Sequence, residues 1–86
     1  MELLREIIRV NGKDGLHARP AAEFVQLCKR LKSDVKLEKN GTVVPGKSII
    51  GIMSLGIAKG EEVKIIVEGD DEGEALNVIK ELLNKE

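Results

Sequence analysis

Three segments of the chain alternate apolar and polar residues, the pattern of a strand with one buried and one exposed face. They are residues 4–10, 34–38 and 63–67, and in the first of them Arg5, Ile7 and Arg9 occupy the outer face. The expected inward-facing residues are Leu4, Ile8, Val10, Val35, Leu37, Val63, Ile65 and Val67. We therefore predict a sheet with one covered face.

A turn signal indicates a fourth strand. Asn40-Gly41 directly follows the second alternating segment. Both central residues of a two-residue hairpin turn need a positive φ angle, which these residue types adopt readily. Residues 42–44 then return as the partner strand, and Pro45-Gly46 ends it.

From Ala18 to Lys32 the apolar residues recur at the helical period. Pro20 suits the first turn of a helix, where its missing N–H is no loss, so this helix should begin close to His17. The expected buried side consists of Ala18, Ala21, Phe24, Val25, Cys28 and Leu31.

Two more helices are predicted further along the chain. Residues 47–55 form a short apolar stretch with Ser48 in the N-cap place. The last helix begins near Asp71, which together with Glu74 resembles a capping box. Its apolar arc is Ala75, Leu76, Val78, Ile79, Leu82 and Leu83.

The predicted order of elements is β-α-β-β-α-β-α. Strands with one polar face need the helices on the other face, which gives an α+β fold of two layers. Eighty-six residues fit one domain, residues 1–86, with one modest core.

Composition and charge exclude several classes of function. The formal net charge is -1, and one Phe is the only aromatic residue. We therefore expect no direct nucleic-acid binding and no membrane insertion. The single cysteine, Cys28, cannot form an internal disulfide, which favours a cytoplasmic protein. No spacing of Cys and His suggests a metal site, and nothing indicates a cofactor.

The segment Gly15–Pro20 carries the candidate chemistry. His17, the only histidine, stands at a predicted helix N-terminus beside Arg19. Free backbone amides, including that of Ala18, gather at such an end and attract anions. The same positive groups favour the uncharged ring, whose nitrogen is a nucleophile. This arrangement suits an imidazole that carries a phosphoryl group, although on the residue types alone an exposed histidine acting as a modest helix cap is the simpler explanation.

The apolar stretch 47–55 is the second candidate. Two helical turns cannot bury Ile49, Ile50, Ile52, Met53 and Leu55 on one side, so some of them should stay exposed as a docking surface. A core helix with one or two exposed apolar residues is the simpler alternative. Cys28 lies on an apolar helix face and is expected to be a core residue without reactivity.

These two segments resemble the histidine-containing phosphocarrier proteins, HPr, of the sugar phosphotransferase system. Residues 15–21, GLHARPA, are similar to the family's active-site signature, and residues 47–56, KSIIGIMSLG, to its regulatory-serine segment. The resemblance covers nearly the whole chain. It implies an open-faced β-sandwich with an antiparallel sheet in the order 1-4-2-3.

The resemblance also implies a function and a set of partners. His17 would accept a phosphoryl group on Nδ1 from phosphorylated enzyme I and pass it to the IIA domains of sugar permeases, with Arg19 stabilising the phosphate. Such a chain is a covalent carrier rather than an enzyme, and we expect a monomer. Ser48 would be modified by HPr kinase/phosphorylase, creating a form that binds a catabolite repressor. The expected docking residues are Ala22, Ile49, Ile50 and Met53.

Two other functions remain possible on the sequence. One is a relative that acts mainly as a serine-phosphorylated corepressor, although relatives specialised in that way lack the active-site histidine that His17 matches. The other is an unrelated α+β nucleic-acid-binding domain, against which the charge and the scarcity of aromatic residues both count.

Overall fold

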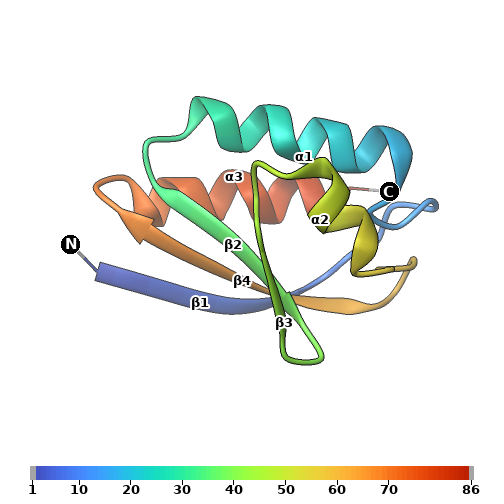
Figure 1. Cartoon of the computed structure of the whole chain (residues 1–86). Helices are drawn as coiled ribbons and strands as arrows, with labels where there is room; N and C mark the ends of the chain where they lie inside the picture. The colour runs from blue at the N-terminus through green and yellow to red at the C-terminus, as the bar shows by residue number, and fades with distance from the viewer. Residues whose placement is uncertain (1, 86) are drawn as a thin grey trace.

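The computed structural model describes residues 2–85, which form seven elements in the predicted order. The strands are β1 (Glu2–Arg9), β2 (Asp34–Lys39), β3 (Thr42–Pro45) and β4 (Glu62–Gly69). The helices are α1 (Ala18–Arg30), α2 (Ile49–Ser54) and α3 (Glu72–Asn84). All three helices lie on one side of the sheet (Figure 1). The α+β fold of two layers is confirmed.

The four strands form one antiparallel sheet in the order β1-β4-β2-β3, as the resemblance implied. The pair β1–β4 aligns Leu4 with Val67, and the pair β2–β4 aligns Leu37 with Ile65. These residues project toward the helices. Because side chains alternate along a strand, the register places one residue in two in the core.

The core lies between the sheet and the helices, and it contains the predicted apolar faces. Phe24, Cys28 and Ile79 are almost completely buried, together with the inner residues of β2 and β4. The other face of the sheet is open, and Leu3, Ile7 and Val43 are exposed there.

The hairpin between β2 and β3 has the predicted turn. Lys39 pairs with Thr42, and the two residues between them, Asn40 and Gly41, have φ angles of 52° and 83°. Gly46, just after β3, is buried, and a Cβ atom there would lie 2.8 Å from the Cys28 Sγ atom. Gly46 is therefore explained by the close approach of its backbone to the first helix.

Two details of the first helix differ from the sequence prediction. The helix ends at Arg30 rather than Lys32, because Leu31 has an extended conformation and its N–H bonds to the Cys28 carbonyl. Ala18, expected on the buried side, is exposed and has a φ angle of 46°. It occupies the first helical position with a left-handed backbone, which turns it away from the core.

The capping box predicted for Asp71 and Glu74 is wrong. Asp71 occupies the N-cap position of α3, but its side chain accepts no bond from that helix. Its carboxylate accepts hydrogen bonds from the Ser33 hydroxyl and from the Lys32 N–H, the latter at 3.2 Å. The connection between α1 and β2 lies close enough to compete for the carboxylate, and sequence spacing does not reveal that contact.

These hydrogen bonds, first the one from Ser33 and then those from backbone amides, lower the pKa of Asp71 below its ordinary value of 3.8. A carboxylate with a lowered pKa stabilises the fold above its ordinary pKa, and this contribution disappears as the pH falls through the lowered value. We expect Asp71→Asn to reduce the free energy of unfolding at neutral pH but not in strong acid. Urea unfolding at both pH values checks this, with exposed Asp70→Asn as the control. An equal loss at both pH values would contradict the assignment.

Candidate functional site

The candidate histidine lies at the end of a loop that is held against another loop. The Leu16 N–H donates to the Ile57 carbonyl at 2.9 Å, and both side chains are buried. Gly15 has a φ angle of 62°, and a Cβ atom there would lie 2.3 Å from the Ile57 oxygen. In Figure 1 this loop, in light blue, runs beside the segment between α2 and β4. The backbone that precedes His17 is therefore held in place by contacts from a distant part of the chain.

His17 is the N-cap residue of α1, which confirms the predicted helix start. Its backbone is extended, with φ -120° and ψ 159°, and its side chain forms no capping hydrogen bond. The residue is half-buried. The imidazole as a helix cap, the simpler alternative, is thus not supported, because the ring does not bond to the helix amides.

The next residues face solvent. Ala18 and Arg19 are both exposed, and the first turn of α1 contains no acidic residue. Within residues 2–85, Arg19 forms no ion pair and no side-chain hydrogen bond. The first amides of a helix lack intrahelical partners. The site thus offers an accessible imidazole next to N–H groups and a guanidinium that are available to an anion.

The second candidate segment also has the expected local structure. Ser48 is the N-cap of α2, and its hydroxyl oxygen accepts a hydrogen bond from the Gly51 N–H at 3.0 Å. The residue is half-buried, so its hydroxyl lies near the surface at the start of the helix. A charge added to this oxygen would sit next to the helix N-terminus, where negative charge is favourable.

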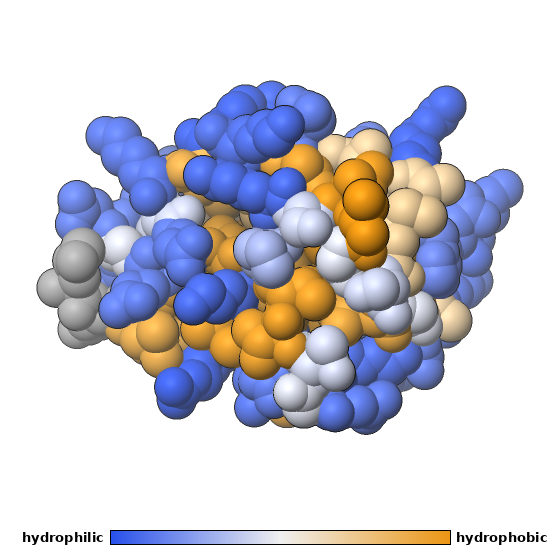
Figure 2. All heavy atoms as spheres, viewed as in Figure 1, coloured by the Kyte–Doolittle hydropathy of each residue, from blue (hydrophilic) through white to orange (hydrophobic). Residues whose placement is uncertain are grey.

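Three of the five apolar residues around α2 are exposed. Ile52 is buried and Leu55 is half-buried, whereas Ile49, Ile50 and Met53 are 39%, 80% and 41% exposed. We call these three residues the α2 patch. Figure 2 shows apolar surface over α2, in orange, between more polar regions. The prediction that two turns cannot bury all five residues is confirmed.

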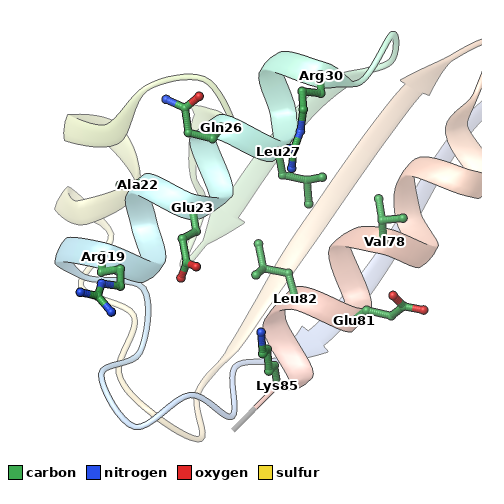
Figure 3. A pocket seen from close by; sticks show the side chains of 10 residues that line it. All are labelled: Arg19, Ala22, Glu23, Gln26, Leu27, Arg30, Val78, Glu81, Leu82 and Lys85. Carbon is green, nitrogen blue, oxygen red and sulfur yellow. The ribbon is translucent and has the colours of Figure 1, made fainter.

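A groove of about 520 Å³ lies between α1 and α3. Leu27, Val78 and Leu82 line it, and Arg19 lies at its rim near the start of α1 (Figure 3). Half-buried Ala22, one turn beyond His17, also borders it. His17 is not among the lining residues, so the candidate histidine is not part of this groove.

Other groups that could carry chemistry are accounted for by packing. Cys28 is buried, and burial raises the pKa of its thiol to about 12, so the thiolate does not form near neutral pH. Across the described residues, no cluster of three or more His, Cys, Asp or Glu is placed to hold a metal ion. In the same part of the chain, no helix is long and apolar enough to span a membrane.

Comparison with known proteins matches nearly the whole chain to one family. The family model described as the PTS HPr component phosphorylation site matches residues 4–85. The chain is 46% identical to the HPr-like protein Crh of Bacillus subtilis (strain 168), over 98% of this chain and 99% of Crh.

Solved structures of similar proteins share the fold. The phosphocarrier protein HPr of Bacillus anthracis superposes with a TM-score of 0.91 and is 43% identical, covering 94% of this chain and 96% of that one. HPr of Thermoanaerobacter tengcongensis superposes with a TM-score of 0.88 at 46% identity, covering 93% and 90%. The likeness therefore extends over both sequence and structure.

Proposed function

Because this chain belongs to the HPr family of the phosphotransferase system, we propose that it is a phosphocarrier that accepts a phosphoryl group on His17. The observation that carries the proposal is the placement of His17. It is an accessible N-cap residue whose ring has no bond to its own helix, next to exposed Arg19. Such a ring is free to react with a group brought by a partner.

The transfer needs positioning and charge stabilisation more than covalent chemistry from the protein. The lone pair of the His17 Nδ1 atom attacks the phosphorus of phosphorylated enzyme I. A nitrogen–phosphorus bond forms, the bond from phosphorus to the donor atom breaks, and its electron pair stays with the donor. The Ala18 N–H and the Arg19 guanidinium receive the negative oxygens. Transfer to a IIA domain follows the same steps with His17 as the donor.

The α2 patch is the proposed docking surface for these partners. Its exposed apolar side chains lie on the helix that packs against α1, the helix that carries His17 at its start. Ala22 extends this surface on α1. A carrier must release each partner, and a small apolar patch with an open histidine suits brief association.

Ile50 gives the sharpest test of the patch, because it is 80% exposed and its replacement should leave the core unchanged. We expect Ile50→Glu to slow phosphoryl acceptance from enzyme I by about tenfold, the effect of losing one well-buried contact in an interface. The loss should be in KM. The matched control is Val43→Glu, because Val43 is 50% exposed on the open face of the sheet. Equal rates for the two variants would contradict docking through α2.

Ser48 is the proposed regulatory site, modified by HPr kinase/phosphorylase. Asp is as good an N-cap as Ser, so Ser48→Asp should keep α2 folded while adding a negative charge at the edge of the docking surface. We expect phosphoryl acceptance at His17 to slow by about three- to tenfold, since charges at an interface rim govern association rates. Ser48→Asn, a neutral cap, is the control. An unchanged rate for Ser48→Asp in a phosphoenolpyruvate-driven assay would refute the regulatory role.

A second candidate function is a binding module in carbon catabolite control. The similarity to Crh favours it, because Crh is the Bacillus subtilis catabolite repression HPr. This chain has both His17 and Ser48. Ser48 is compatible with either function, whereas His17 favours the carrier, because relatives specialised as corepressors lack the matching histidine. The chain could act as a Ser48-phosphorylated partner of a catabolite repressor.

One experiment separates these functions. The purified chain is incubated either with enzyme I and phosphoenolpyruvate or with HPr kinase/phosphorylase and ATP. The mass of each product is then measured by mass spectrometry. The carrier function predicts one phosphate in the first reaction, lost in mild acid and transferred to a IIA domain. A chain that takes phosphate only in the second reaction, in acid-stable form, would be the binding module.

A further inference from the structure

A lysine at the end of β2 reaches the loop that supports the histidine. The Lys39 ammonium donates to the Gly56 carbonyl at 3.2 Å and to the Glu61 carboxylate at 2.9 Å. The Lys39 side chain is only 17% exposed, so solvent screens this ion pair less than a fully exposed one. One side chain of the sheet therefore holds both ends of the segment 56–61.

Glu61 closes the segment from the other side. The carboxylate oxygen that meets Lys39 also accepts the Ala58 N–H at 2.7 Å, and the Glu61 N–H donates to the Ala58 carbonyl at 3.0 Å. The bonds from Lys39 and then from Ala58 lower the pKa of Glu61 below its ordinary value. The carboxylate is thus engaged in its charged form, as this network requires.

Ile57 lies between the two anchored residues, Gly56 and Ala58. Its side chain is completely buried, and its carbonyl is the acceptor for the Leu16 N–H, one residue before His17. With Gly56 held by Lys39 and Ala58 held by Glu61, the peptide group that presents this carbonyl cannot rotate freely. The position of the backbone just before His17 therefore depends on contacts made by Lys39 and Glu61.

We infer that Lys39 and Glu61 are positioning residues for His17, acting through the Ile57 carbonyl on the Leu16 backbone. This inference rests on the proposed phosphocarrier function for its catalytic consequence. The mechanical part, that the pair holds the loop, stands on the hydrogen bonds alone. Neither residue touches the reacting atoms, so their effect is on the orientation of the ring and not on bonding to phosphate.

Other ion pairs in the described residues do not connect to this loop. The pair Lys80–Glu6 is as short, at 2.8 Å, but it joins α3 to β1. Its removal should lower the free energy of unfolding by a comparable amount, but it should not affect the hydrogen bond of the Leu16 N–H. It therefore supplies the matched control for any effect of simply losing an ion pair.

Amide hydrogen exchange tests the mechanical part directly. We expect the Leu16 amide to exchange about tenfold faster in Lys39→Met and in Glu61→Ala, because weakening a supporting hydrogen bond promotes local opening. The Ile65 amide in the central strand β4 should change only as far as global stability does. Lys39→Arg should restore protection, and Lys80→Met should leave Leu16 unchanged. Equal Leu16 exchange in the wild type, Lys39→Met and Glu61→Ala, or an equal increase in Lys80→Met, would overturn the inference.

The rate of phosphoryl acceptance tests the consequence. We expect Lys39→Met and Glu61→Ala to lower kcat about three- to tenfold with KM little changed, because a displaced nucleophile reacts more slowly once the partner is bound. Faster Leu16 exchange with an unchanged kcat would overturn the positioning role. If the wild-type chain accepts no phosphate at all, the proposed function fails instead, and the exchange data still decide whether the pair holds the loop.

Discussion

Replacing His17 with alanine is expected to abolish phosphoryl acceptance while leaving the protein folded. The ring supplies the attacking nitrogen, and this chain contains no other histidine that could replace it. Its side chain makes no capping bond to α1, and the residue is only half-buried. We therefore expect a stability change of at most about 0.5 kcal/mol, as for surface substitutions that remove no structural contact.

The measurement combines thermal unfolding with phosphate incorporation from phosphoenolpyruvate and enzyme I. Arg19→Ala serves as the comparison, because it removes a phosphate-binding group but leaves the nucleophile. That variant should retain acceptance at a rate reduced by about 10²-fold, the cost of losing one charge-stabilising donor. Acid-labile phosphate on the His17→Ala variant would place the reactive group elsewhere.

Replacing Gly15 with alanine is expected to have the largest effect on stability near the site. Gly15 has a φ angle of 62°, and a Cβ atom would lie 2.3 Å from the Ile57 oxygen and 2.9 Å from the Ala58 Cα atom. Both neighbours are backbone atoms that cannot move aside as a flexible side chain would. Strained backbone and a steric clash together should cost about 3 kcal/mol. The clash would also separate Leu16 from the Ile57 carbonyl, so the folded fraction should accept phosphate poorly.

Gly56→Ala is the matched control for this experiment. Gly56 has the same φ angle of 62°, but no atom lies within 4 Å of the position of its Cβ. It therefore pays only the conformational cost, about 1 kcal/mol. Urea unfolding of both variants measures the difference. If Gly15→Ala is no less stable than Gly56→Ala, the contact between the two loops does not contribute as described.

Much of the fold follows from local patterns that the sequence states directly. The alternation in β2 and β4 predicts which residues are buried, and Asn40-Gly41 predicts the hairpin with its two positive φ angles. Ser48 behaves as the predicted N-cap. Each of these depends on neighbours within a few residues. The order of the strands does not, and it was expected only through the resemblance to a known family.

The errors have two physical causes, one distant in sequence and one local. Asp71 has the right position and residue type for a cap, yet Ser33 and Lys32 take its carboxylate. Ala18 fits a helical period, yet the backbone there is left-handed and the side chain faces solvent. Local spacing reports which contacts a residue can make, and the fold decides which of them it makes.

In the candidate site too, the sequence predicts the local features but not the contacts from distant residues. Sequence places His17 and Arg19 at the start of a helix, and it indicates that some apolar residues of α2 stay exposed. It does not reveal the support for the histidine. The Ile57 carbonyl lies far along the chain, and Lys39 and Glu61 look like ordinary surface charges of a strand end and a turn. Only their distances show that they act on one loop.

The central claim is that the phosphoryl group is carried by the Nδ1 atom of His17. Phosphorus and nitrogen NMR tests it most directly, using the chain labelled with ¹⁵N-histidine and phosphorylated by enzyme I and phosphoenolpyruvate. Because the sequence has one histidine, only one ring can give a nitrogen–phosphorus coupling. We expect a single phosphorus resonance coupled to Nδ1 that disappears in mild acid. An acid-stable phosphorus resonance without coupling to nitrogen would contradict it.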